Sequence, residues 1–280
     1  MPLFIKLNDE NRKRLFNSVK KNINSSWDKF YPSLGVSRSM FFHYLSGKHN
    51  LPKKIFRKLE GMAGIKINAF EQIMQNKYEK KEMVAPKMSE LLAEILGVLN
   101  GDGHISKFKY EVCVVGDLRE KDYYNYLQNL FGSVFRIFFT IYETSSCLKL
   151  RTYSINLSNF LTNQYKLPKG NKLKRLRIPR QVFSSKKLLA AYLRGLFDTD
   201  GSFYIRRNNE PVVQITSASP IFLKEIREAL ISFNFNVARG NQRIFLYHRK
   251  DIKRFFESIK PANPKHLKKY QNYLKLYLRG

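Results

Sequence analysis

The sequence predicts an α+β protein in which a small all-α domain precedes two similar halves of αββαββα order, with bounds at residues 1–85, 86–182 and 183–280. Two nine-residue segments, Ile95–Gly103 and Leu193–Gly201, share one pattern, and the second begins 98 residues after the first. The same alternation of strand-forming and helix-forming segments follows each of them. A repeat of this length is too long for a solenoid unit and is typical of two pseudo-symmetric subdomains.

The N-terminal domain is predicted to be a set of short helices. Apolar residues at helical spacing predict a helix over 11–21, and a second helix is expected over about 26–31. Gly35 suits a tight turn, and Ser37 can cap the next helix, predicted over 36–46. This arrangement is similar to the helix-turn-helix of repressor-type DNA-binding domains, with the third helix as the recognition helix.

The recognition helix has polar residues on the face that points away from the core. The apolar positions that can face inward at helical spacing are Val36, Met40 or Phe41, and Tyr44 or Leu45. The outward candidates for DNA binding are Arg38, Ser39 and His43. The domain has 17 basic and 7 acidic residues, a net charge of +10 that suits DNA. A helical bundle that binds another protein is the alternative, because Pro32 interrupts the helix expected before the turn.

Residues 76–87 are the predicted linker. They are charged, lack sustained apolar periodicity and include Pro86. Ser89 is then expected to cap a helix that leads to Asp102, with leucine and isoleucine residues as its apolar stripe.

The two nine-residue segments are predicted to be the ends of two helices that pack closely. In each segment small residues lie four positions apart, and so on one helix face: they are Gly97 with Gly101, and Gly195 with Thr199. Small residues on one face let two helices approach backbone to backbone.

Each segment closes on an acid followed by glycine. Asp102 and Asp200 would lie at the C-terminal ends of the two helices, where the helix dipole disfavours negative charge. Two neighbouring carboxylates are costly to ionise unless a cation neutralises them, so the pair predicts a metal site. The alternative is a pair of structural helix ends with glycine at C′.

These segments resemble the motifs of the LAGLIDADG homing endonucleases, in the single-chain form with two motif copies, and the resemblance covers about residues 89–280. It implies that Asp102 and Asp200 bind divalent metal and are catalytic, one for each DNA strand. It also implies two or three Mg²⁺ ions, with Gly101 and Thr199 lending backbone carbonyl oxygens.

One motif position departs from the family pattern. The earlier acid of the motif is Asn100 in the first copy and Asp198 in the second. This position is less strictly tied to catalysis in the family, so both copies are expected to be active.

Strands and helices complete each half in the same order. After Asp102 the first half is predicted to have a strand, a strand over 111–115, a helix over 120–131, two strands including 147–152, and a helix over 154–165. The second half is predicted to have strands over 202–207 and 212–216, a helix over 220–233, two strands including 243–247, and a helix over 250–259. Such hairpins predict antiparallel sheets with helices on one face. The family fold places the open faces side by side as a concave saddle over DNA.

A lysine follows an Asn-containing turn after the last repeated helix of each half. These lysines are Lys172 and Lys265. In the family a basic residue near this place polarises the solvent beside the scissile phosphate, and a lysine there can stabilise transition-state charge. The alternative is a pair of solvated lysines in a chain that has many.

The open strand faces are expected to read the DNA. The candidates are Lys107, Lys109, Lys149 and Arg151 in the first half, and Arg206, Arg207, Gln214, Arg243, Tyr247 and Arg249 in the second. Arginine and lysine pair with guanine, and glutamine with adenine, in the major groove. Contact with phosphate or plain solvation is the alternative for each of them.

The composition fits a folded protein that binds nucleic acid. The chain has 51 basic and 22 acidic residues, a net charge of +29 that attracts polyanions. Aromatic residues at 14% and hydrophobic residues at 43% exclude a disordered basic tail. The histidines and the two cysteines lack metal-ligand spacing. No segment resembles a membrane span or a secretory signal, so we expect a cytoplasmic protein, nucleoid-associated in a prokaryote.

Together these features predict a monomeric, magnesium-dependent, site-specific endonuclease that cuts both strands of double-stranded DNA. Each half supplies one acid, so no partner subunit is needed. Two alternatives stay open on the same scaffold: a non-cleaving transcriptional regulator, and an RNA maturase that assists intron splicing.

Overall fold

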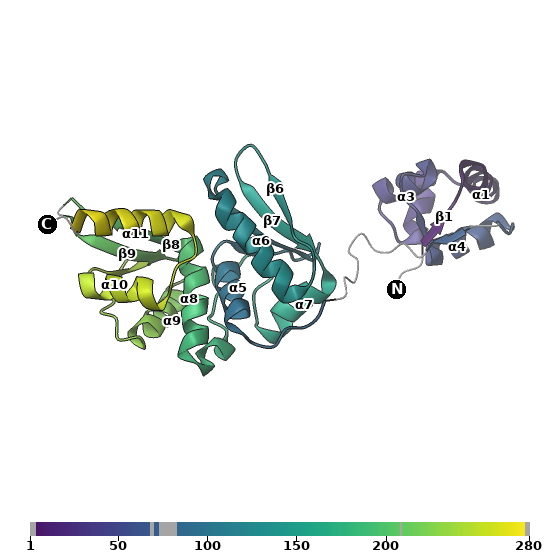
Figure 1. The fold of residues 1–280 in the computed structure, drawn as a ribbon. Coiled ribbons are helices and arrows are strands. Elements are labelled where there is room, and N and C mark those ends of the chain that lie inside the picture. The colour runs from purple at the N-terminus through teal and green to yellow at the C-terminus, as the bar shows by residue number, and fades with distance from the viewer. Residues whose placement is uncertain (1–3, 68–69, 73–82, 208, 278–280) are drawn as a thin grey trace. The chain divides into compact units, whose positions relative to one another are not determined.

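The computed structural model describes residues 4–67, 70–72, 83–207 and 209–277. The chain divides into two compact units, Met1–Lys77 and Tyr78–Gly280 (Figure 1). Each unit has a hydrophobic core of its own. The predicted linker over 76–87 lies outside the described residues up to residue 82, and residues 83–87 form neither helix nor strand.

The first unit combines helices with a small sheet. Its elements are β1 (Phe4–Lys6), α1 (Asp9–Asn22), α2 (Trp27–Phe30), the 3₁₀ helix η1 (Tyr31–Leu34), α3 (Arg38–Ser46), β2 (Leu51–Pro52), α4 (Lys53–Ala63) and β3 (Phe70–Gln72). The strands pair in the order β2-β1-β3. The expectation of an all-α domain is therefore wrong. Strands of two or three residues are too short to show an alternating pattern, and these form only when distant segments of the unit meet.

The turn before α3 follows from its side chains. Gly35 ends η1 with a φ of 69°, a conformation that glycine adopts without strain. The Ser37 hydroxyl accepts a hydrogen bond from the backbone N of Met40, 3.3 Å away, so the helix begins at Arg38 and not at residue 36. Phe41 is fully buried whereas Met40 is exposed, so Phe41 is the residue that faces the core.

The second unit runs twice through one order of elements. The first half consists of α5 (Glu90–Asn100), β4 (Gly103–Ile105), β5 (Glu111–Gly116), the 3₁₀ helix η2 (Leu118–Glu120), α6 (Lys121–Phe135), β6 (Thr140–Glu143), β7 (Leu148–Tyr153), α7 (Ile155–Gln164) and the 3₁₀ helix η3 (Arg180–Ser184). The second half consists of α8 (Lys186–Asp200), β8 (Gly201–Ile205), β9 (Pro211–Thr216), α9 (Pro220–Ile231), β10 (Ala238–Gly240), β11 (Arg243–Leu246), α10 (Arg249–Ser258) and α11 (Pro264–Tyr277). The predicted α+β class with two αββαββα halves is confirmed. Helix α11 lies beyond the repeat and was not expected.

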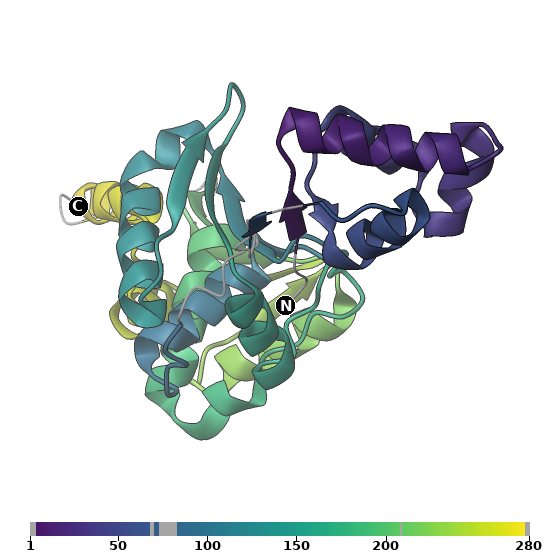
Figure 2. The same cartoon turned by 90° about the vertical axis from the view of Figure 1, so that its right-hand side faces the viewer.

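Each half has a four-stranded antiparallel sheet with one helix-covered face. The strand orders are β4-β5-β7-β6 and β10-β11-β9-β8. In β7 the buried residues Leu148, Leu150 and Thr152 alternate with the partly exposed Lys149 and Arg151. The buried face packs against helices and the other face carries basic side chains, as alternation in a strand requires. The β6–β7 hairpin extends beyond the helices of its half (Figures 1 and 2).

Helices α5 and α8 lie side by side between the two halves (Figure 1). Their glycines allow the close approach: a Cβ atom on Gly97 would come within 2.8 Å of the Leu196 backbone N. A Cβ atom on Gly195 would come within 2.9 Å of the Val98 backbone N. One hydrophobic core runs through this helix pair and joins both halves.

Candidate active site

Both predicted acids lie at the C-terminal ends of the central helices. Helix α5 ends at Asn100 and Asp102 follows, whereas α8 continues through Asp200. Burial raises the pKa of the Asp200 carboxyl to about 6, the Asp102 charge adds to this shift, and Lys172 opposes it. Burial also raises the pKa of Asp102. The Asp102 charge thus disfavours ionisation of the Asp200 carboxyl, as expected for two acids that face a common cation site.

The small residues beside the acids touch across the helix pair. A Cβ atom on Gly101 would come within 2.8 Å of the Thr199 Cβ. The Thr199 hydroxyl donates back into its own helix, with distances of 3.0 Å to the carbonyl oxygens of both Gly195 and Leu196. The threonine side chain is thus satisfied within α8.

Lys172 caps the end of α5. Its Nζ atom donates to the carbonyl oxygens of Asn100 at 3.1 Å and Gly103 at 2.8 Å, and to that of Gly101. Carbonyl groups at a helix C-terminus lack partners within the helix and carry partial negative charge. Burial lowers the pKa of Lys172, and the charges of Asp200 and Asp102 oppose that shift. The structure thus brings this lysine to the two acids.

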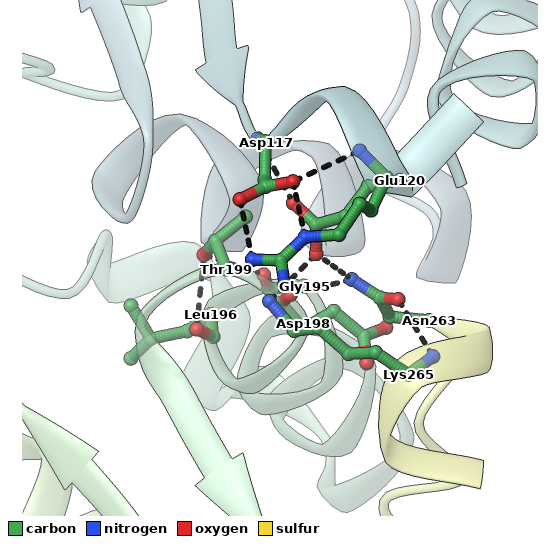
Figure 3. A network of polar contacts seen from close by, with 9 residues as sticks. Asp117, Glu120, Gly195, Leu196, Asp198, Thr199, Asn263 and Lys265 are labelled. Carbon is green, nitrogen blue, oxygen red and sulfur yellow. Dashed lines mark hydrogen bonds and ion pairs between the residues drawn. The ribbon is translucent and has the colours of Figure 1, made fainter. Parts of the chain in front are cut away.

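Lys265 is held in a different way. Its Nζ atom lies 2.7 Å from Oε1 of Glu120, which comes from the first half of the repeat. The Asn263 side-chain amide donates to the same oxygen at 2.9 Å and to the Asp198 carbonyl oxygen at 3.0 Å (Figure 3). The sequence placed the two lysines at equivalent positions, but their contacts differ.

Glu120 and Asn263 were missed as site residues. Glu120 is in the capping box Asp117-Leu-Arg-Glu120, in which its Oε2 accepts a hydrogen bond of 3.3 Å from the Asp117 backbone N. That pattern in the sequence signals a helix start and gives no hint of a distant lysine. Asn263 belongs to the turn that drew attention to Lys265, and its own role becomes visible only in the folded chain.

The position of the earlier motif acid faces the interior in both halves. The Asn100 amide donates to the Tyr192 hydroxyl at 2.7 Å and to the Arg177 carbonyl oxygen at 2.9 Å. Asp198 is fully buried and accepts a hydrogen bond of 2.8 Å from the Ala262 backbone N. Burial raises the pKa of Asp198 to about 7. These contacts explain why an amide and an acid both fit this position.

The arrangement suits a hard cation such as Mg²⁺. The donors are the carboxylates of Asp102 and Asp200, and Mg²⁺ takes such oxygen ligands together with several waters. The Gly101 carbonyl oxygen already accepts from Lys172, so it could join them only after that contact breaks. Among the residues that the structure describes, no cluster of three or more His, Cys, Asp or Glu side chains could hold an ion. A hollow of about 540 Å³ beside the acids is lined by residues that include Gly101, His104, Lys172 and Asp200.

The candidate DNA-binding residues of the second unit lie on the strands and their ends. Lys107 and Lys109 are exposed in the β4–β5 loop, Lys149 and Arg151 lie on β7, Arg206 and Arg207 follow β8, Gln214 lies on β9, Arg243 lies on β11, Tyr247 follows β11, and Arg249 opens α10. Two arginines stack on tyrosine rings, each 4.7 Å from the ring centroid: Arg151 on Tyr142 and Arg206 on Tyr247. Such stacking fixes the direction of the guanidinium group.

The candidates of the first unit lie on α3. Arg38 and Ser39 are exposed, whereas His43 is half-buried with its ring 5.1 Å from that of His49. Arg38 forms an ion pair of 2.8 Å with Asp28. The outward face expected for α3 is present, although its arginine already has an acidic partner.

A family model described as a LAGLIDADG-like domain matches residues 187–260. The matched segment runs from α8, with the second motif and Asp200, to the turn after α10. This segment is therefore similar to a LAGLIDADG-like domain. The first half of the second unit repeats the element order of the LAGLIDADG-like segment, from α5 with Asp102 to α7.

Several solved structures are similar to this chain. The N-terminal LAGLIDADG domain of DUF199/WhiA is 19% identical with a TM-score of 0.44, covering 62% of this chain and 85% of that one. The homing endonuclease I-DmoI in complex with DNA and Mn is 15% identical, with a TM-score of 0.44. The match covers 61% of this chain and 96% of the I-DmoI chain. The K262A mutant of I-SmaMI is 15% identical, with a TM-score of 0.47. The match covers 68% of this chain and 91% of the I-SmaMI chain. No curated protein matches the chain.

In the described part of the chain, no helix has the length and apolar character needed to cross a membrane.

Proposed function

We propose that this chain is a site-specific endonuclease that cuts both strands of double-stranded DNA with divalent metal bound at Asp102 and Asp200. The pairing of these two acids carries the proposal. They lie at the ends of two helices in backbone contact, and burial raises the pKa of both carboxyls. The LAGLIDADG-like match over 187–260, which includes Asp200, supports it.

The chemistry would be hydrolysis of a phosphodiester. A water oxygen bonds to phosphorus, the bond from phosphorus to the 3′ oxygen breaks, and the 3′ oxygen takes up a proton. Bound Mg²⁺ would supply charge stabilisation on the phosphate and a water of lowered pKa. Asp102 and Asp200 would hold it, next to the backbone carbonyls of Gly101 and Thr199. Lys172, half-buried at the end of α5, would donate to a phosphate oxygen as negative charge develops there.

DNA would lie on the open faces of the two sheets. The chain has a net charge of +29, and basic side chains such as Lys149 and Arg151 lie on the uncovered face of β7. The two arginines that stack on tyrosine rings, Arg151 within β7 and Arg206 after β8, are proposed to contact bases or phosphates. The first unit, with its helix-turn-helix-like segment and basic charge, would add a second set of DNA contacts through α3.

One chain would be sufficient for activity. The acids Asp102 and Asp200 come from the two halves of a single second unit, and so each DNA strand would meet one acid of the same molecule. We therefore propose that the protein acts as a monomer.

The test is cleavage of a supercoiled plasmid that carries the joined flanks of the reading frame, the sequence expected before insertion of a mobile element. Purified protein with Mg²⁺ is expected to linearise this plasmid and to leave the same plasmid with scrambled flanks intact. Tight binding of the joined flanks without cleavage would favour a non-cleaving regulator. Preferential binding of the flanking transcript, with faster splicing, would favour a maturase.

A further inference from the structure

Glu120 holds Lys265 across the boundary between the two halves. Its Oε1 atom forms an ion pair with the Lys265 Nζ at 2.7 Å and accepts a hydrogen bond from the Asn263 amide at 2.9 Å (Figure 3). Only 12% of the Glu120 side chain is exposed. The Asn263 amide also reaches the Asp198 carbonyl oxygen near the end of α8, at 3.0 Å. The ammonium group is thus anchored beside the acids by a carboxylate that is itself fixed.

Lys172 has no such partner in the other half. Its contacts are the neutral carbonyl oxygens at the end of α5, and within the described residues it forms no ion pair. The loop equivalent to Asp117–Glu120 lies between β9 and α9, where the chain reads Ser217, Ala218 and Ser219. This loop is uncharged, so nothing there can neutralise the lysine.

The two lysines also face hollows of different size. Lys172 lines the hollow of about 540 Å³, whose wall includes Ser217 and Ala218. Lys265 lines one of about 210 Å³, whose wall includes Arg119 and Glu120. The surroundings of the two lysines therefore differ in cavity volume and in the presence of a carboxylate partner.

We propose that Glu120 withholds Lys265 from DNA, so that the strand served by Lys172 is cut first and the strand served by Lys265 second. This inference rests on the proposed endonuclease function. Before Lys265 can approach a phosphate it must leave a short, charge-assisted contact, and the freed Glu120 carboxylate then repels the same phosphate. Lys172 leaves backbone carbonyl oxygens and, within the described residues, no ion pair, and the acids Asp102 and Asp200 act on both lysines. Glu120 is on this account a positioning residue that sets the order of the two cuts.

Glu120→Gln removes the charge with a small change in shape. Glu120 accepts from the Asp117 backbone N through Oε2 and from Asn263 through Oε1. The single glutamine oxygen can keep the capping-box bond to Asp117, and the amide NH₂ group then takes the place of Oε1 beside Lys265. Asp122→Asn is the matched control. It removes the same charge two residues away, from an exposed side chain that forms no ion pair with Lys265 in the described contacts.

The first measurement does not depend on catalysis. Binding of a 40-bp duplex of mixed sequence is followed by fluorescence anisotropy in EDTA over a series of salt concentrations. Glu120→Gln is expected to bind about threefold more tightly than Asp122→Asn, with a salt slope steeper by about one unit, because one more lysine reaches a phosphate. Equal affinities and slopes for the two variants would show that Glu120 does not mask Lys265.

The second measurement is single-turnover cleavage of the plasmid with joined flanks, with the nicked strand identified by end labelling. The wild-type protein is expected to accumulate nicked circles, and Glu120→Gln to speed the second cut about tenfold without changing the first. Lys265→Met should stop at the same nick as the wild type. Lys172→Met should lose that nick and should slow cutting by roughly 10²-fold, more than it weakens binding.

Three results would overturn the order of cutting: linear product without a nicked intermediate, a slower second cut in Glu120→Gln, or the same acceleration in Asp122→Asn. A wild-type protein that cuts neither strand would overturn the proposed function together with the order. The binding measurement in EDTA would still decide whether Glu120 withholds Lys265.

Discussion

At the scale of single residues, Asp102 and Asp200 are the groups on which the proposed chemistry depends. Asp102→Asn or Asp200→Asn is expected to abolish double-strand cleavage, because the metal loses a carboxylate ligand, while DNA affinity changes less than about threefold. Gel electrophoresis of the plasmid products and anisotropy in Ca²⁺ measure the two effects. Asp122→Asn, an exposed acid, is the control and should cut normally. Normal cutting by either site variant would show that the catalytic acids lie elsewhere.

The pKa of Asp200 gives a pH prediction with a definite sign. The folded value of about 6 lies above the unfolded value of about 3.9. The folded protein therefore binds this proton more tightly, and in EDTA the free energy of unfolding falls as the pH rises from about 4 to 6. Asp200→Asn is expected to melt higher than the wild type at pH 7.5, by about 2–4 °C for each kcal/mol gained.

Differential scanning fluorimetry with and without Mg²⁺ checks this prediction. The difference in Tm should narrow at pH 5, and Mg²⁺ at pH 7.5 should stabilise the wild type more than Asp200→Asn, because it binds only a complete site. A variant less stable than the wild type at pH 7.5 in EDTA would mean that the Asp200 charge is well compensated in the folded state.

At the scale of elements, the contact between α5 and α8 positions both acids. Gly97→Ala would place a methyl group against the Tyr192 carbonyl and 2.8 Å from the Leu196 backbone N, so the helices must separate. We expect the free energy of unfolding, measured in urea, to fall by roughly 2 kcal/mol or more, since overpacking typically costs about 1–3 kcal/mol. Cleavage should be impaired as well, because the two acids move apart with the helices.

Gly132→Ala is the matched control for this helix contact. Gly132 lies within α6, and the nearest atom to an added Cβ is the Ile137 carbonyl oxygen at 3.8 Å, an ordinary contact. The free energy of unfolding of Gly132→Ala should rise by roughly 0.5–1 kcal/mol, because alanine loses less backbone entropy in a helix than glycine does. Equal effects of the two substitutions would contradict the close helix approach.

At the scale of the whole molecule, the two units have separate hydrophobic cores. Residues 1–77 carry 15 basic and 5 acidic residues, a net charge of +10, which leaves +19 on the rest of the chain. Deleting residues 1–77 should leave a folded protein that still cuts the plasmid, with weaker binding and a shallower dependence on salt. Circular dichroism and anisotropy over a salt series test this. Unchanged affinity and salt slope would show that the first unit does not touch DNA.

Features that depend on neighbours along the chain could be predicted from the amino-acid sequence. Helical periodicity and capping serines placed α3 and α5, and the repeat of small residues and acids predicted the paired helix ends with Asp102 and Asp200. Alternation in β7 predicted which face carries Lys149 and Arg151. The order of elements in both halves follows from these local patterns.

Contacts between residues far apart in the sequence became visible only in the folded chain. Glu120 and Asn263 are 143 positions apart, and their contact with Lys265 makes the two lysine sites unequal. The sheet of the first unit likewise joins segments near its two ends, as in the pairing of Ile5 with Glu71. Local propensity is set within a few residues, whereas such contacts exist only after the core has brought both partners together, so no pattern along the chain contains them.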